Sequence, residues 1–265
     1  MYAQFRPAVY DFRRTRGGPV VRTTREAYAN WSIGTDPRRS WRLGFTPEIG
    51  WNEDGGGFTG FFFDISWTPV PALSLTMSPT YSRSHGEAQY VDAFDDPTAE
   101  SFFGTRYVFA DLDSRNLSLD TRMNVTFTPN MTLQLFAQPF ISSNDYSEWK
   151  EYTRTRDNDR DVFEDVTVVT DPESGDREIT IDPDGAGPAT SFSFTEPDFN
   201  LRSLRGNAVF RWEYMPGSTL FLVWTQDRAS FENVGDFQFG RDRSALFDAD
   251  AEHVFLIKIN YWFAI

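Results

Sequence analysis

The chain contains only two histidines, His85 and His253. His253 follows Glu252 and lies close to Asp250, and a histidine near carboxylates can act as a general base. No Gly-x-Ser-x-Gly nucleophile motif accompanies it, and His85 is expected in an external turn. The sequence therefore does not predict an enzyme, and a hydrolase with an Asp/His site at the rim of a barrel is kept as an alternative.

A second candidate is a run of aspartates, Asp157-x-Asp159-x-Asp161, which has the spacing of calcium-binding carboxylates. The calcium loop requires glycine where Val162 stands and a bidentate glutamate where Val168 stands. A solvated acidic loop is therefore favoured over a metal site. No cofactor is expected, and the absence of cysteine excludes thiolate ligands and disulfides.

The largest set of polar side chains is defined by its position along predicted strands. These residues alternate with apolar ones, so they share one face of a sheet and are expected to line the lumen of a barrel. Such a lumen is an aqueous path if it is wide and is filled by ion pairs if it is narrow. The predicted lumen-lining residues are Arg42, Glu48, Asp64, Asp120, Arg122, Gln134, Gln138, Arg205, Arg211, Glu213 and Lys258.

The elements that carry these residues show a period of two. In the segment 73–82, Leu73, Leu75 and Met77 alternate with serine and threonine. The C-terminal segment 254–263 has the same alternation and is rich in aromatics, which is typical of the last strand of an outer-membrane β-barrel. No apolar run approaches the roughly 18 residues that a membrane helix needs.

Short Pro-containing turns alternate with long polar segments. With the C-terminal end placed in the periplasm, the Pro turns fall on the periplasmic side, and segments 144–199 and 231–252 become external loops. The segment at about 145–199 is acidic and is expected to form one long external excursion, with weak strand patterns at 166–169 and 178–181; a disordered loop is the alternative. About twelve strands are predicted, near residues 2–12, 27–35, 41–52, 58–67, 73–82, 88–94, 105–112, 116–127, 131–141, 201–214, 219–228 and 254–263.

Composition agrees with strands that are apolar on one face only. Aromatic residues make up 17% of the chain, although charged residues make up 24% and the net charge is −14. A net negative charge of this size argues against nucleic acid as a partner, because phosphates require a basic surface.

Three stretches and the chain's ending carry a resemblance to a known family. They are Arg16-Gly-Gly-Pro; Arg106-Tyr-Val-Phe-Ala-Asp-Leu-Asp with the following Arg122 to Pro129 and Leu133 to Pro139; and the run Arg211-Trp-Glu-Tyr-Met-Pro-Gly-Ser-Thr-Leu-Phe-Leu-Val-Trp-Thr-Gln, with Phe-Leu-Ile-Lys-Ile-Asn-Tyr-Trp-Phe at the end. The chain resembles the bacterial family of domain of unknown function 5916, over nearly its whole length. The resemblance implies the C-terminal outer-membrane barrel of longer proteins, which carry a carbohydrate-binding-module-like domain ahead of it. It implies no catalytic residues.

The sequence thus predicts an all-β fold, an antiparallel transmembrane β-barrel over residues 1–265. The barrel is either whole or the C-terminal half of a larger one, with the fragment favoured. The expected location is the bacterial outer membrane, with lipid and the barrel assembly machinery as partners. The expected function is a pore or surface-binding protein for glycans or small polar solutes. A soluble β-sandwich carbohydrate-binding module is the other alternative; it would pack the Phe- and Trp-bearing faces together.

Overall fold

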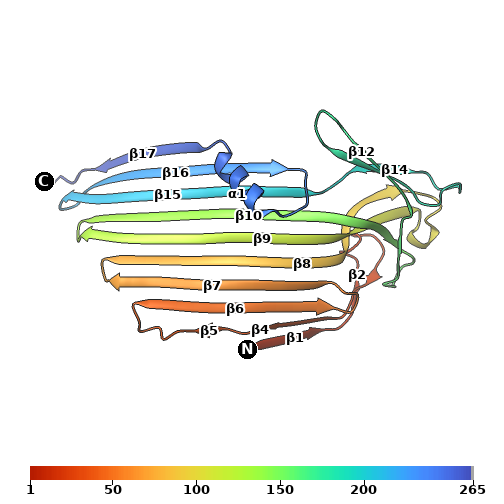
Figure 1. Cartoon of the computed structure of the whole chain (residues 1–265), viewed down its shortest axis with the longest axis horizontal. Coiled ribbons are helices and arrows are strands. Elements are labelled where there is room, and N and C mark those ends of the chain that lie inside the picture. Colours follow the sequence, from red (N-terminus) through yellow and green to blue (C-terminus); the bar gives the residue numbers. More distant parts are fainter. Residues whose placement is uncertain (264–265) are drawn as a thin grey trace.

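One broad antiparallel sheet dominates the computed structural model, which describes residues 1–263 (Figure 1). Along the sheet the strands follow the order β1-β4-β6-β7-β8-β9-β10-β15-β16-β17, and two short strands, β5 and β11, extend it to twelve. The strands of this main sheet are β1 (Tyr2–Arg6), β4 (Glu26–Asn30), β5 (Ile33–Gly34), β6 (Trp41–Asn52), β7 (Gly57–Val70), β8 (Leu73–Asp95), β9 (Thr105–Thr128), β10 (Met131–Tyr152), β11 (Arg160–Val162), β15 (Phe199–Met215), β16 (Ser218–Glu232) and β17 (Glu252–Asn260).

The predicted all-β antiparallel fold is confirmed, but four predicted strands are really two. Segments 73–82 and 88–94 form the single strand β8, and segments 105–112 and 116–127 form β9. β8 and β9 pair along their whole lengths, with register shifts after Gly86 and after Tyr90 that interrupt the local pattern without ending the strand. Bulges of this kind shift the alternation of side chains, which explains why the sequence pattern predicted two segments for each strand. His85 accordingly lies inside β8, which corrects its predicted place in a turn.

Cross-strand pairs divide the main sheet into two faces, because residues directly opposite each other in an antiparallel sheet point to the same side. Trp41 pairs with Trp67, and Phe45 pairs with Phe63. Following such pairs from strand to strand defines the apolar face: Phe5, Ala27, Ala29, Trp41, Leu43, Phe45, Ile49, Trp51, Phe61, Phe63, Ile65, Trp67, Leu73, Leu75, Met77, Tyr81, Leu117, Leu119, Met123, Val125, Leu133, Leu135, Ala137, Ile141, Leu204, Ala208, Phe210, Trp212, Leu220, Leu222, Trp224, Phe255, Ile257 and Ile259.

The apolar face is largely uncovered. On β17 the side chains of Phe255, Ile257 and Ile259 are 76%, 69% and 66% exposed. The other sheets in the described residues are small, with three strands and two strands, so no second sheet packs on this face. The helix Phe239–Asp248 covers part of it near the loop end, where it contacts Arg202 and Arg228. The sandwich alternative is therefore wrong for the described part of the chain, since its apolar faces would have to be in contact.

The two ends of the main sheet differ. Tight turns join β7 to β8, β9 to β10, and β15 to β16 at the end where Asn260 lies, which we call the turn end. At the opposite end, the loop end, longer segments join β8 to β9, β10 to β15 and β16 to β17. The predicted contrast between short Pro-containing turns at one end and long segments at the other is confirmed.

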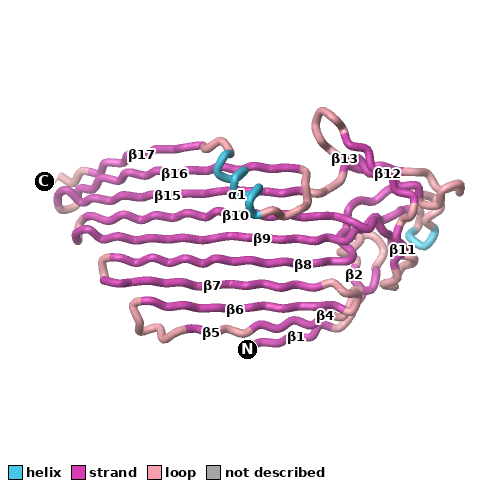
Figure 2. Tube along the Cα trace, in the orientation of Figure 1, coloured by secondary structure: helices cyan, strands magenta, loops and turns pink. Residues whose placement is uncertain are grey.

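A separate small unit, the cap, sits at the loop end (Figure 2). It contains the ends of β8, β9 and β10 and holds the buried hydrophobic clusters, which include Val108, Phe109, Trp149 and Ile179. The long acidic segment is therefore folded, and its two weak strand patterns are real strands. The other elements here are β2 (Tyr10–Asp11), β3 (Val21–Arg22), β12 (Asp165–Thr170), β13 (Arg177–Asp182), β14 (Phe192–Thr195) and the 3-10 turn Glu100–Phe102.

One helix, α1 (Phe239–Asp248), lies against β15 and β16 near the loop end. Its Asp242 accepts hydrogen bonds from Arg202, and both side chains are fully buried. No helix in the described residues has the length and apolar character to cross a membrane.

The sheet is open. β1 and β17 form its two edges and do not pair with each other within residues 1–263. A barrel closed by these strands alone, one of the two forms that the sequence predicted, is therefore not observed. The sheet does not bring its edge strands within hydrogen-bonding reach.

Candidate functional site

The face opposite the apolar one is polar, and all the predicted lumen-lining residues lie on it. Arg42 is opposite Ser66, Asp120 is opposite Ser78, and Arg122 is opposite Thr76, so their positions share one side across neighbouring strands. The same pairing places Gln138 opposite Arg205. We call this the polar face.

Short-range contacts join several of these residues. The Gln138 amide donates to Asp120 at 2.5 Å, and the Arg42 guanidinium donates to the Ser66 hydroxyl at 2.9 Å. Arg211 pairs with Glu213 at 3.0 Å. These contacts link near neighbours and leave the face as a hydrogen-bonding surface along its length.

A cavity of about 600 Å³ lies where the polar face meets the cap. Its floor contains one row of paired residues across β1, β4, β6, β7 and β8: Gln4, Tyr28, Gly50, Phe58 and Ser84. Tyr152, Asn158 and Arg160 line it from the cap side. The site thus depends on the contact between the main sheet and the cap.

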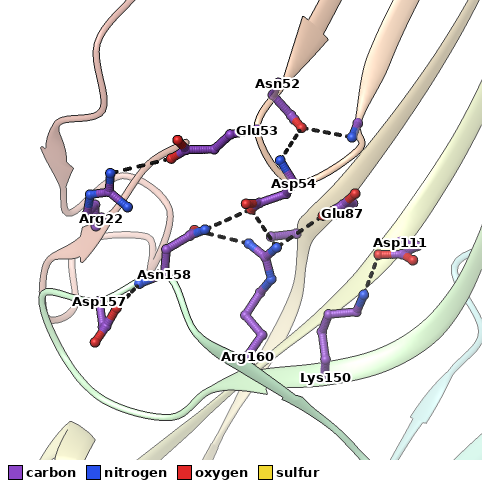
Figure 3. A network of polar contacts seen from close by, with 12 residues as sticks. Arg22, Asn52, Glu53, Asp54, Glu87, Asp111, Lys150, Asp157, Asn158 and Arg160 are labelled. Atoms are coloured by element: carbon purple, nitrogen blue, oxygen red, sulfur yellow. Dashed lines mark hydrogen bonds and ion pairs between the residues drawn. The ribbon is translucent and has the colours of Figure 1, made fainter. Parts of the chain in front are cut away.

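Arg160 fixes that docking (Figure 3). Its guanidinium binds the carboxylate of Asp54 at 2.6 Å and that of Glu87 at 3.2 Å, and Asn158 donates to Asp54 at 2.8 Å. All three charged side chains are largely buried. Burial, together with the neighbouring Asp54 carboxylate, raises the pKa of Glu87.

Two further buried ion pairs hold the cap strands to one another. Lys150 binds Asp111 at 2.5 Å, and burial raises the pKa of Asp111 although the ammonium group opposes the shift. Arg106 binds Asp96 at 2.7 Å and also contacts Glu151. Because removing one partner of a buried pair leaves an uncompensated charge, these contacts make the cap a fixed part of the site.

The three aspartates considered as calcium ligands do not form a metal site. Asp157 and Asp159 both face Arg154, and Asp161 lies in β11. The described residues contain no group of three or more acidic, histidine or cysteine side chains suited to a metal ion. The neighbouring guanidinium supplies the positive charge that a cation would otherwise provide.

The histidines lie on the side of the apolar face, nearer the loop end. The Trp224 indole N–H donates to His253 Nδ1 at 3.1 Å. Glu252 directly precedes His253 in β17, so its side chain points to the other face of the sheet. The Nδ1 atom of His85 lies 3.5 Å from the Oδ2 atom of Asp113. Neither contact brings a hydroxyl nucleophile to the histidine, and the hydrolase alternative gains no support from this geometry.

Sequence reasoning missed the residues that build the cavity. Asp54 and Arg160 are separated by 106 positions, and no local pattern links them. The one available signal was the position of Gly50 on the polar side of a strand pattern, because a glycine inside a strand often marks a place where something approaches the backbone closely.

The comparisons with known proteins give one match. The family model described as Domain of unknown function (DUF5916) matches residues 2–264, nearly the whole chain. Neither the curated proteins nor the solved structures provide a match. The chain therefore belongs to the DUF5916 family.

Proposed function

We propose that the main sheet is part of the wall of a bacterial outer-membrane β-barrel, with lipid on its apolar face and an aqueous path along its polar face. The observation that carries the proposal is the separation of charge. Among the described residues, the cross-strand rows of the apolar face that pass through Met131, Leu133, Leu135 and Ala137 contain no Asp, Glu, Lys or Arg, whereas the polar face carries arginines and carboxylates in mid-strand. Transmembrane barrels require this alternation. Nearer the loop end, Arg83, Arg115, Arg202 and Arg228 lie on the apolar side, and Arg202 and Arg228 contact α1.

The size of the apolar face supports lipid over water as its neighbour. Ten strands lie about 4.8 Å apart, and their apolar stretches are about 30 Å long, so the apolar face has an area on the order of 1,000 Å². The largest apolar patch on a soluble monomer is about 300–600 Å². An exposed face of this size in water would cause aggregation, whereas hydrocarbon is a suitable solvent for it.

The length of the apolar stretch along each strand fits a bilayer. On β10 the apolar side chains run from Met131 to Pro139, eight steps at about 3.4 Å each, or about 27 Å along the strand, before Ile141, which is only 4% exposed. At the usual barrel tilt of about 40° this becomes about 21 Å, within a few ångströms of the apolar band of about 25 Å in outer-membrane barrels. Trp41, Trp67 and Trp212 mark the turn end of these stretches, where an aromatic girdle is expected.

Closure completes the proposal. The ten strands from β1 to β17 alternate in direction, so the two edge strands run antiparallel to each other. In hydrocarbon both edges must be hydrogen-bonded. A barrel forms if β1 and β17 pair directly or if an even number of further strands lies between them.

Single cysteines test the proposal, because the chain has no cysteine of its own. Gln134 and Leu135 are neighbours on β10 and point to the polar and apolar faces, respectively. In outer-membrane preparations, a water-soluble maleimide should label Gln134→Cys, and it should label Leu135→Cys only after the membrane is dissolved and the protein unfolded.

The proposal also predicts that the protein fractionates with outer membranes and migrates differently on gels before and after heating. Recovery of a soluble monomer without detergent, with both cysteines labelled equally, would contradict it. The pore and the surface-binding form share this test, since both need a lipid-facing wall.

A further inference from the structure

We infer that the cavity between the polar face and the cap binds a neutral oligosaccharide. The inference deepens the proposed function and rests on it in one respect, namely that the polar face is in contact with water. A cavity of about 600 Å³ has the size of a site for a drug-sized ligand, and therefore for a few sugar rings.

The floor of the cavity presents two aromatic side chains, and the ring of one of them, Phe58, extends over Gly60, where an added Cβ atom would be 3.0 Å from its Cε1 and Cζ. Tyr28 and Phe58 lie on either side of Gly50 in one cross-strand row. A Cβ atom added to Gly50 would be 3.7 Å from both side chains, so the space above this glycine is bordered by both residues. Aromatic rings offer flat apolar surfaces, and the C–H faces of a sugar ring can pack on them.

Hydrogen-bonding groups of both kinds surround the rings. Gln4 and Ser84 end the same row, and Glu48 lies next to it on β6. An amide and a hydroxyl both donate and accept, whereas a carboxylate only accepts. Hydroxyl groups of a sugar can satisfy all three, because each hydroxyl is itself a donor and an acceptor.

The charges that line the cavity nearly balance, which argues for a neutral ligand: three arginines (Arg6, Arg14, Arg160) stand against four carboxylates (Glu26, Glu48, Asp54, Glu87), a formal net charge of −1. Arg6 pairs with Glu26 at 3.5 Å. Arg160 is already engaged by Asp54 and Glu87, as Figure 3 shows. An anionic ligand would lie next to carboxylates, because Arg6 and Arg160 are already paired with them. A cationic ligand would lie next to those same arginines.

The two remaining charges are of opposite sign. Arg14 and Glu48 line the cavity and have no ion-pair partner in the part of the chain that the structure describes. Arg14 donates to the Ala88 carbonyl at 3.4 Å. Their charges cancel each other, and they provide two strong hydrogen-bonding groups for hydroxyls.

The experiment is calorimetric titration of the full chain in nanodiscs. The probes are maltotriose, cellotriose and tri-N-acetylchitotriose, with trigalacturonate and the glucosamine trimer as anionic and cationic counterparts. At least one neutral trisaccharide should bind saturably and at least tenfold more tightly than both charged sugars. Preference for a charged sugar, or no binding of the neutral ones, overturns the inference.

Two variants locate the site. Gly50→Val should weaken neutral-sugar binding at least tenfold, because its nearest Cβ contact is 3.5 Å and the fold accepts it while the methyl groups fill the space above this position. Tyr28→Ala should weaken binding at least fivefold. Phe221→Ala is the matched control, since Phe221 lies on the polar face on β16, opposite Arg211 and Lys258, and does not line the cavity; the affinity of this variant should stay within twofold.

Failure here can be distinguished from failure of the proposed function. If cysteine labelling shows a lipid-facing wall but no neutral sugar binds, the proposed function stands and this inference is wrong. If the protein is soluble, the proposed function is wrong, and sugar binding can still be measured in buffer. Unchanged affinity in Gly50→Val removes the cavity as the site whatever the solvent of the apolar face.

Discussion

A charge placed on the apolar face should destabilise the protein, and the same charge one residue away should not. Leu135 is on β10 with Met123 and Ala208 beside it on the neighbouring strands. It lies four steps from Met131 and four from Pro139, about 14 Å along the strand in each direction. At a tilt of about 40° these distances are about 10 Å each, so the side chain would lie near the bilayer midplane.

The expected cost follows from that depth. Leu135→Arg should lower the free energy of unfolding in lipid vesicles by about 2–4 kcal/mol, the range for arginine at the midplane of a barrel wall. Phe127→Arg, at the turn end of β9, should cost only about 0–1 kcal/mol because it lies near the interface. Gln134→Arg is the matched control on the polar face and should change stability by about 0.5 kcal/mol or less.

The assay is urea unfolding in vesicles, followed by tryptophan fluorescence. If Leu135→Arg and Gln134→Arg have equal effects, the apolar face is not in hydrocarbon and the reasoning is refuted. A large effect at Phe127 together with a small one at Leu135 would equally contradict the placement of the bilayer.

Two further outcomes are expected. Asp242→Ala leaves the fully buried Arg202 with one partner fewer, so it should cost about 3–5 kcal/mol locally and release α1, measured as faster amide exchange in residues 239–248; the exposed Asp248→Ala is its control, and equal exchange in both variants would contradict the anchor. Burial, together with Asp198, raises the pKa of Glu196 from 4.5 to about 7, so the folded cap holds a proton that the unfolded chain releases, and its stability should fall by up to about 3 kcal/mol as pH rises from about 4.5 to above 7. Urea unfolding of the cap across that range should show the slope, and Glu196→Gln should abolish it; a slope of opposite sign would contradict the assignment.

The sequence by itself determined which side chains share a face. Alternation in a strand is a local property, because successive residues point to opposite sides of the backbone, so the polar positions from Arg42 to Lys258 could be assigned without knowing any partner strand. The same locality gave the Pro-containing turns such as Pro216-Gly217, where glycine adopts a positive φ of 78°.

Only the tertiary structure decided how far each strand runs, whether the sheet closes and where the cavity lies. β8 and β9 stay continuous through their bulges because they pair with each other, and a pairing between segments cannot be read from either one alone. The cap is joined to the sheet where Arg160 reaches Asp54 across 106 positions, and the row from Gln4 to Ser84 exists only once five strands are in register. The face of Glu48 could be predicted from its strand alone, but the contacts between distant segments that form the cavity around it depend on the whole fold.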